Sequence, residues 1–400
     1  MPVARSVEPH ELDRAGEVGF IAFGGTLEEW QQAHHQHVDA FGPEKVLVVE
    51  HEGTVVSSMF IIPEGMHLGD SVVPSAAVGG VATVPEARRL GCAAAMMHET
   101  VRRMRADGVA TSAMWPFSFS YYRKFGWEAG GEIRVLRIPR DTEFRVEALG
   151  SAAPAGPGDL DDIARVWDST APHHRCATQR VTSNWEWHLK ADQFGGARED
   201  RAGFVYRENG AVLGYLFYTV PELKEGEEVR PVEIQELRAI SHQAQVGLLR
   251  ALMGHVDRET FEVGVSVADP LRSLAVNPRA IETFLHANFG FRVIDPGQIF
   301  PTMRTDAAQA PVNITVDDVL LGPRSWRLAF AGGGVEAEEV PTEGDTRCTI
   351  QTFSQIASGL LKPLSAASAG LLTGPANAVA ALEAATAHWN LPYRSGLERG

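Results

Sequence analysis

The sequence predicts a mixed α/β protein with more than one domain. Strand-like and helix-like stretches alternate along most of the chain. The 400 residues exceed one ordinary core, since a domain averages roughly 150 residues. A proline- and glycine-rich stretch without periodicity lies at 150–158, and the pattern of strand-like and helix-like segments changes again near residue 296. We therefore expect a first domain at 1–149, a linker at 150–158, a second domain at 159–295 and a small α+β domain at 296–400.

The first domain alternates strands and helices. Strands are expected at 3–7, 45–62, 72–84, 109–115 and 132–138, the second of them a hairpin turning at Glu52-Gly53. Helices are expected at 27–41 and from Leu90 to Asp107. In the second of these, apolar residues recur at spacings of three and four and Asp107-Gly108 ends the pattern.

The second domain loosely repeats this order. A hairpin at 203–220 turns at Asn209-Gly210, a strong type I′ signal, and is followed by a strand at 232–240 and a helix at 245–256. This order predicts an internal duplication. The third domain has strand patterns at 313–321, 325–340 and 346–351, then helical patterns at 353–364 and 377–389.

Composition limits the function classes. The net charge of −15 argues against a nonspecific nucleic-acid binder, which usually needs a basic surface. The three cysteines Cys92, Cys176 and Cys348 form no CxxC pair, so neither a disulfide framework nor a structural zinc site is expected. No apolar leader and no membrane-length apolar run is visible, so the expectation is a soluble cytoplasmic protein with no membrane partner.

A candidate anion site lies at "VPEARRLGCA", residues 84–93. It follows a hydrophobic strand and opens a helix, and Gly91 stands in the first turn, where glycine costs roughly 1 kcal/mol relative to alanine. The free N–H groups of a helix N-terminus favour anions, and Arg88 and Arg89 add positive charge. A pyrophosphate would fit, although an isolated turn of this kind is more often an ordinary one.

A second motif, "YYRKFGWE" at 121–128, follows after a further strand. Together the two motifs resemble those of the GNAT N-acetyltransferases. The order of two αβ units and a small C-terminal unit is similar to the Eis-like aminoglycoside N-acetyltransferases. That resemblance spans the whole chain and implies tandem GNAT folds, the second degenerate, followed by a sterol-carrier-like α+β domain. It also implies acetyl-CoA as the acetyl donor and no metal.

The resemblance assigns roles residue by residue. It implies contacts to coenzyme A by Val81, Thr83, Arg88, Arg89, Gly91, Cys92 and Ala93. Tyr122 would be the general acid, and a phenol with a pKa of about 10 holds a proton for the departing thiolate at neutral pH. The family's general base is the chain's terminal carboxylate, here that of Gly400. The family usually ends in an aromatic residue, whereas this chain ends "GLERG", so Glu398 or ordered water are alternatives.

The acceptor is expected to be a cationic small molecule, such as an aminoglycoside or a polyamine. Carboxylates and aromatic rings suit such an amine, and the candidates in the resemblance are Phe23, Glu28, Glu29, Trp30, Gly79 and Gly80. For the two glutamates a solvated helix face is the plainer interpretation. The resemblance also implies a homo-oligomer, a hexamer.

Several alternatives stay open. The acceptor could instead be a protein lysine or a biosynthetic amine, or the C-terminal domain could carry an apolar ligand without any enzymatic role. Cys92, in a helix first turn that lowers thiol pKa values, could act as a nucleophile. The histidines of "HHQH", residues 34–37, lie on an expected helix but lack a metal-binding pattern.

Overall fold

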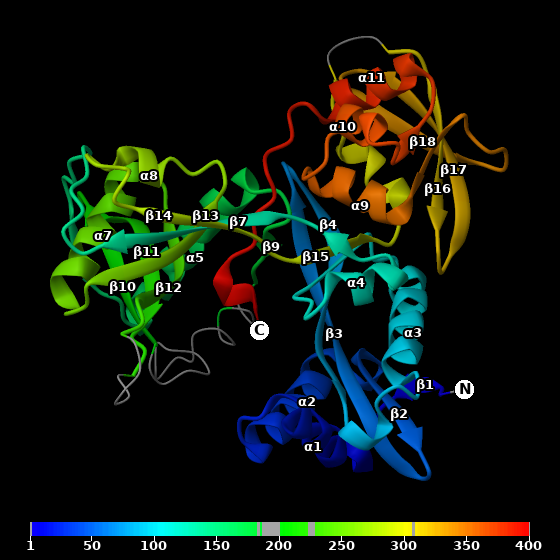
Figure 1. The fold of residues 1–400 in the computed structure, drawn as a ribbon, viewed down its shortest axis with the longest axis horizontal. Helices are drawn as coiled ribbons and strands as arrows, with labels where there is room; N and C mark the ends of the chain where they lie inside the picture. The colour runs from blue at the N-terminus through cyan, green and yellow to red at the C-terminus, as the bar shows by residue number, and fades with distance from the viewer. Residues whose placement is uncertain (1, 182–184, 186–200, 223–228, 306–308, 400) are drawn as a thin grey trace. The chain divides into compact units, whose positions relative to one another are not determined.

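The computed structural model describes residues 2–181, 185, 201–222, 229–305 and 309–399. It contains three mixed or antiparallel sheets with helices packed on them, which confirms the α/β fold class (Figure 1). The chain divides into two compact units. Unit 1 consists of Met1–Met66, Val73–Gly130 and Phe289–His388, and unit 2 of His67–Val72, Gly131–Asn288 and Trp389–Gly400.

The first sheet has the order β1-β2-β3-β4-β5-β15-β6. Its strands are β1 (Ala4–Ser6), β2 (Val46–His51), β3 (Thr54–Leu68), β4 (Ser71–Thr83), β5 (Thr111–Met114), β15 (Gly290–Val293) and β6 (Glu128–Ala129). Its helices are α1 (Leu12–Phe23), α2 (Leu27–Phe41), α3 (Cys92–Ala106) and α4 (Phe119–Tyr122). Strands β4 and β5 pair in parallel only from Ser75 to Val78, after which β4 continues to Thr83 beside β3 but without β5.

The second sheet has the order β14-β7-β13-β12-β11-β10-β8. Its strands are β14 (Glu282–Ala287), β7 (Glu132–Pro139), β13 (Thr260–Ser266), β12 (Val232–Ala239), β11 (Ala211–Thr219), β10 (Arg201–Glu208) and β8 (Ser151–Pro154). The helices are α5 (Leu160–Thr170), α7 (His242–His255) and α8 (Leu271–Leu274). The two-residue strand β9 (Thr178–Gln179) follows α5 in the chain but pairs with β3 of the first sheet.

The third sheet has the order β18-β17-β16-β19-β20 and lies in unit 1. Its strands are β16 (Val312–Asp318), β17 (Gly322–Ala331), β18 (Gly334–Val340), β19 (Thr346–Thr349) and β20 (Leu372–Thr373). The helices are α9 (Ile350–Ser358), α10 (Pro363–Ser368) and α11 (Ala376–Thr386).

Local sequence signals explain several boundaries. Helix α2 has the predicted range, because Thr26 and Glu29 form a capping box at its start and Gly42, with φ 92°, ends it. The predicted hairpin turns at Glu52-Gly53 and Asn209-Gly210 are also confirmed, since all four residues have the positive φ of a type I′ turn.

The predicted domain boundaries differ from the compact units. The stretch 150–158, expected to be a linker, contains β8, whose small residues pair with β10 at a sheet edge. Strand β7 pairs within the second sheet, and β15 inserts between β5 and β6 of the first. The positions of β7 and β15 both depend on pairing between segments far apart in the chain, and the sequence has no local signal for such pairing.

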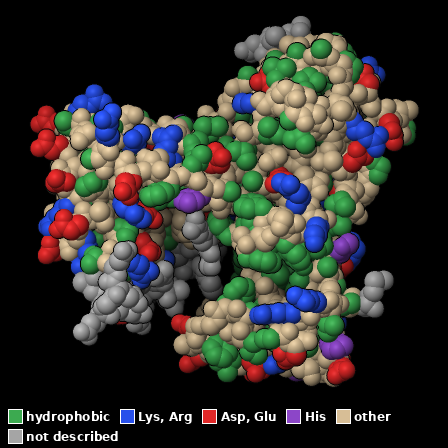
Figure 2. Space-filling view, viewed as in Figure 1, with side chains coloured by type: hydrophobic (Ala, Val, Ile, Leu, Met, Phe, Trp, Pro, Cys, Tyr) green, Lys and Arg blue, Asp and Glu red, His purple; other side chains and the backbone are tan. Residues whose placement is uncertain are grey.

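None of the helices within the described residues has the length and apolar character that crossing a bilayer requires. On the face drawn in Figure 2, acidic and basic side chains are interspersed rather than gathered by sign.

Candidate functional site

The "VPEARRLGCA" motif forms a tight turn into helix α3. The N–H groups of Ala87 and Arg88 bond back to the carbonyls of Val84 and Pro85. Arg89 has φ 69° and Gly91 has φ 90°, both in the left-handed region. A non-glycine residue in this region is uncommon and is often found at ligand sites. The turn therefore redirects the chain so that the N-terminus of α3 opens onto solvent.

The turn has the properties of an anion site. The first N–H groups of α3 lack intrahelical acceptors, and the helix dipole places positive potential there. Arg88 and Arg89 are exposed, and neither guanidinium has an ion pair or hydrogen bond to the described residues. Cys92 is buried just behind the turn, and this burial raises the pKa of its thiol. The expected lowering of that pKa is wrong, so the structure does not favour a nucleophilic role.

The free end of β4 leads into this turn. Beyond its last pair with β5, residues 79–83 include the expected coenzyme contacts Val81 and Thr83, both half-buried. The Ser57 hydroxyl holds this strand by donating to the Ala82 carbonyl at 2.5 Å, and it lies 2.6 Å from the Thr83 hydroxyl. At residues 79–83, the backbone groups on the edge of β4 that faces away from β3 do not pair with β5. They are therefore available to an extended ligand.

The tyrosine motif forms a short helix and turn, α4. Ser118 caps the helix by accepting from the Tyr121 N–H at 3.3 Å, and Gly126, with φ 93°, ends the turn. A Cβ at Gly126 would lie 1.5 Å from the Arg292 guanidinium, so only glycine fits there. Gln351 on α9 donates to the Arg123 carbonyl at 2.9 Å. The third sheet's layer therefore supports the turn from within the same unit.

Tyr122 has a buried ring and is 4% exposed. It packs edge-on against Tyr121 and Phe117, with ring centroids 5.1 and 5.5 Å away. Burial, and secondarily the neighbouring Tyr121, raises its pKa well above the ordinary value of 10. No hydrogen bond joins its hydroxyl to another described residue. The phenol is thus protonated at neutral pH and its proton is free for a ligand.

Helix α3 connects the two motifs. Cys92 at its start and Tyr122 share one hydrophobic core, and His98 on the same helix lies edge-on to Phe125 at 5.7 Å. The structure therefore brings the predicted coenzyme turn and the predicted acid into one packed unit.

Two of the expected acceptor residues, Phe23 and Trp30, form an aromatic pair. Their rings stack at 5.3 Å, and Trp30 donates from its indole to the Gly24 carbonyl at 2.8 Å. Gly80 lies against this pair with φ 58°, and a Cβ there would be 2.9 Å from Phe60. Phe60 thus leaves no room for a side chain at position 80. The positive φ of Gly80 also favours glycine there, because other residues rarely adopt it.

The remaining expected acceptor residues are Glu28, Glu29 and Gly79. Glu28 is exposed on α2, whereas Glu29 accepts from the Thr26 N–H and hydroxyl at 3.0 and 2.8 Å as part of the helix cap. A Cβ at Gly79 would lie 3.1 Å from Ile62. Glu29 therefore has a structural role, and Glu28 is the carboxylate free to meet a cation.

His34 also belongs to this aromatic cluster, which was not predicted from the sequence. It is buried against Phe60, with ring centroids 4.4 Å apart, and its Nδ1 donates to the Trp30 carbonyl at 2.8 Å. Nε2 is buried without a partner among the described residues. Burial lowers the pKa of His34 to about 4, so the ring is neutral at pH 7. The spacing of four from Trp30 to His34 was the available signal.

The three histidines of "HHQH" hydrogen-bond to three different partners. His35 lies 2.9 Å from Asp13 and His37 is 3.0 Å from the Ile61 carbonyl. Within the described part of the chain, no group of three histidine, cysteine or acidic side chains is arranged to hold a metal ion.

The neutral His34 predicts a pH-dependent stability. Its folded pKa lies below the unfolded value of 6.5, so the unfolded chain binds the extra proton and stability falls as the pH drops from 6.5 towards 4. Between pH 7 and pH 5 the loss due to His34 is about 2 kcal/mol. Chemical unfolding of the native chain and of His34→Phe at both pH values should show a smaller decrease for the variant. Equal decreases would contradict the assignment.

The two candidate bases lie at the C-terminus. Gly400 lies outside the described residues, so its role stays a prediction. Glu398 is buried in unit 2, where its carboxylate lies 3.4 Å from Arg394 and 3.7 Å from Arg180. It also accepts from the Ser395 N–H at 3.1 Å. These partners engage the carboxylate and leave it no free side for a substrate amine.

Comparison with known proteins identifies the three parts of the chain. Residues 4–130 and residues 176–293 each match an acetyltransferase (GNAT) domain, and residues 298–394 match a sterol carrier protein domain. The N-acetyltransferase Eis of Mycobacterium tuberculosis is 25% identical over 226 residues, which are 54% of this chain and 54% of that protein. The chain therefore has two GNAT acetyltransferase domains followed by a sterol carrier protein domain, and about half of it is similar to the N-acetyltransferase Eis.

Solved structures share the fold of the whole chain. Eis1 from Mycobacterium abscessus superposes with a TM-score of 0.76 at 20% identity, covering 98% of both chains. A GCN5-related N-acetyltransferase from Anabaena variabilis gives a TM-score of 0.84 at 18% identity, covering 98% of this chain and 99% of that one. The sequence match to the curated relatives spans about half of their length.

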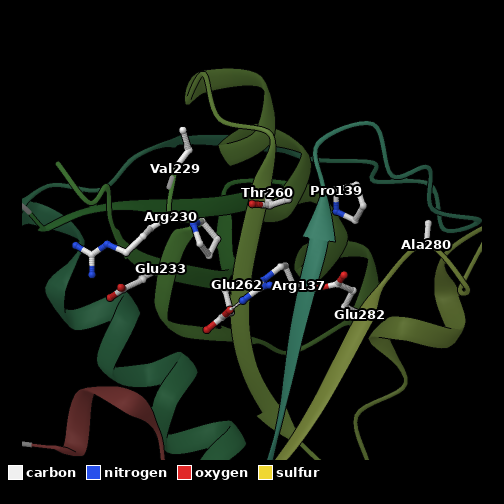
Figure 3. Close-up of a pocket in the computed structure, with 10 residues that line it drawn as sticks. Arg137, Pro139, Val229, Arg230, Glu233, Thr260, Glu262, Ala280 and Glu282 are labelled. Carbon is white, nitrogen blue, oxygen red and sulfur yellow. Dashed lines mark hydrogen bonds and ion pairs between the residues drawn. The ribbon is translucent and has the colours of Figure 1, made fainter. Parts of the chain in front are cut away.

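A cavity of about 570 Å³ lies in unit 2, and none of the residues expected to bind the coenzyme lines it (Figure 3). It is open and charged, and Arg137 in it lies 3.2 Å from Glu262 and 3.3 Å from Glu282. Its lining residues are Arg137, Pro139, Val229, Arg230, Pro231, Glu233, Thr260, Glu262, Ala280 and Glu282. Arg137 is thus already paired with carboxylates, and the lining has three glutamates and two arginines, which makes the cavity a poor pyrophosphate site.

Proposed function

We propose that this protein is an acetyl-CoA-dependent N-acetyltransferase that transfers acetyl to a primary amine of a cationic small molecule. The observation that supports it most is the pairing of an open, cationic helix N-terminus at 88–93 with a protonated Tyr122 in the same packed unit. The GNAT domain match to residues 4–130 covers both motifs.

The residues fit the coenzyme. Arg88, Arg89 and the first N–H groups of α3 would hold its pyrophosphate, and the unpaired end of β4 at Val81 and Thr83 would bond its extended arm. When bound, acetyl-CoA supplies a reactive thioester. Direct attack by a bound amine needs proximity and a positioned proton donor, and Tyr122 would protonate the departing sulfur.

The acceptor would lie against the Phe23–Trp30 pair, with Glu28 as the free carboxylate. The stacked aromatic pair would attract a cationic amine through cation–π contacts, and the exposed Glu28 carboxylate would attract it through an ion pair. An aminoglycoside or a polyamine has this chemistry. A hexameric assembly is part of the proposal by family resemblance.

An apolar carrier role gains no support from the cavity at Pro301 to Glu336. That cavity, of about 240 Å³, is lined by glycine backbone and by the charged Arg304 and Glu336. A lipid tunnel would need an apolar lining.

Thiol release from acetyl-CoA, measured across a panel of aminoglycosides, polyamines and lysine peptides, tests the proposal. Release that depends on cationic small amines is expected. Release with lysine peptides alone would move the acceptor class to proteins, and no amine-dependent release under any condition would exclude the enzyme.

Arg89→Ala should raise the KM for acetyl-CoA by about tenfold with kcat little changed, because one charge-assisted phosphate contact is worth roughly 1–2 kcal/mol. Steady-state kinetics at varied acetyl-CoA measure this. Arg102→Ala is the matched control, since Arg102 lies further along α3 and pairs with Glu99. Equal KM values for both variants would make the turn purely structural.

Extension of the chain past Gly400 tests the base. If the terminal carboxylate takes the amine proton, a short C-terminal tag should lower kcat by about a hundredfold. The same tag at the N-terminus is the control. A fully active C-terminally tagged enzyme would exclude the carboxylate and leave water as the proton acceptor.

A further inference from the structure

The two GNAT domains have the same central strand arrangement. In the second domain β12 and β13 pair in parallel from Val232 to Ile234, and β12 then runs on as residues 235–239. In the first domain β4 continues past its pairing with β5 by the same length, as residues 79–83. We call the unpaired region of β12 and β13 the splay of the second domain.

The second domain lacks the other parts of a coenzyme site. In the first domain residues 84–91 separate β4 from α3, but only residues 240 and 241 separate β12 from α7. No pyrophosphate turn can form in two residues. The short helix α8 ends at Leu274 where α4 ends at Tyr122, so the acid is also missing.

The chain's own C-terminal tail occupies this splay. The Tyr393 hydroxyl donates to the Gly264 carbonyl on β13 at 2.8 Å. The Ser395 hydroxyl donates to Glu236 on β12, and a Cβ at Gly396 would lie 2.7 Å from the Gln235 carbonyl. The tail thus contacts both splayed strands.

The tail brings a carboxylate and two aromatic rings to buried arginines of the second domain. Arg175, Arg180 and Arg238 are buried in the second domain, and Arg180 forms an ion pair with Glu236 at 2.7 Å. The tail adds Glu398, which lies 3.7 Å from Arg180 and 3.4 Å from the tail's own buried Arg394, and two aromatic rings that lie against Arg175 and Arg238. Trp389 lies 3.5 Å from the Arg175 guanidinium, and Tyr393 lies 4.8 Å from that of Arg238.

We propose that the second GNAT domain is a receptor for the chain's own C-terminal peptide, which takes the place that acyl-CoA would have there. The domain therefore holds no second coenzyme, and each chain binds one. The comparison with a coenzyme site rests on the proposed function, whereas the binding of the tail does not.

The first experiment cuts the tail in the full chain. A specific protease site is inserted between Ala387 and His388, which are both exposed, and the released segment is followed by size-exclusion chromatography after cleavage. We expect the segment to co-elute with the rest of the chain. Glu398→Gln should speed its release roughly a hundredfold, because Arg180 and Arg394 lose a buried partner. Leu391→Ala, at an exposed tail position, is the matched control and should retain the segment.

Release of the native segment as fast as that of Glu398→Gln, from a chain with unchanged near-ultraviolet circular dichroism, would overturn the proposal. If cleavage unfolds the chain, a synthetic peptide of residues 389–400 should restore the native spectrum. Unfolding that the peptide cannot reverse would count equally against it.

The second experiment counts coenzymes. Equilibrium dialysis with labelled coenzyme A should give one molecule per intact chain, and the coenzyme should not displace the cut segment. Two molecules per chain, or displacement at matching concentrations, would show that the splay still binds coenzyme. No binding at all would refute the proposed function, while the retention of the tail would still decide the receptor proposal.

Discussion

Replacement of Tyr122 by phenylalanine should lower kcat by about a hundredfold or more, while the KM for acetyl-CoA changes by less than about twofold. The ring packs among Phe117, Tyr121 and Phe125, and phenylalanine keeps those contacts. Only the proton donor is removed, so the effect falls on the step that expels the thiolate. Steady-state kinetics at saturating amine measure it.

The pH dependence separates this role from a structural one. Burial raises the pKa of Tyr122 well above 10, so the phenol remains protonated throughout the neutral and mildly alkaline range. The loss in Tyr122→Phe should therefore be the same at every pH in that range. Tyr121→Phe is the control, because Tyr121 is the adjacent, half-buried tyrosine. Full activity of Tyr122→Phe, or an equal loss in Tyr121→Phe, would remove Tyr122 as the acid.

Local signals predicted the elements around this site well. Helix α2 follows from its capping box and glycine stop, and the order strand, turn, helix around Arg88 follows from periodicity and a glycine with positive φ. Such features depend on neighbours within a few residues. The turn at 84–91 could therefore be predicted from sequence, and its role in binding coenzyme A stays a prediction.

Long-range pairing could not be predicted in the same way. Strand β15 inserts into the first sheet, and the tail beyond Trp389 belongs to unit 2, yet neither segment differs in composition from an ordinary strand or loop. Glu398 illustrates the consequence. From its position near the chain end it was a candidate base, whereas one of its buried arginine partners, Arg180, is distant in sequence.

The second domain's core contains the largest expected stability effect. Glu236 is buried on β12 and accepts from Arg180 at 2.9 and 2.7 Å and from the Tyr215 hydroxyl at 2.6 Å. Burial alone would raise its pKa, but the Arg180 guanidinium outweighs burial and lowers the value to about 2. Its contribution to stability is therefore fully present above its unfolded pKa of 4.5 and is lost as the pH falls through 2.

Glu236→Gln should lower the free energy of unfolding by about 3–5 kcal/mol, because it leaves the buried Arg180 without its main counter-charge. Urea unfolding measures the loss, and hydrogen exchange in β11 and β12 should locate it in the second domain. Glu233→Gln on the same strand is the control, with an expected change within about 0.5 kcal/mol, since Glu233 is only half-buried. A double variant, Arg180→Met with Glu236→Leu, should recover part of the loss, because it removes both charges together. An unchanged stability in Glu236→Gln would mean that the Arg180 charge is compensated elsewhere, and the tail's Glu398, 3.7 Å from it, is the group to replace next.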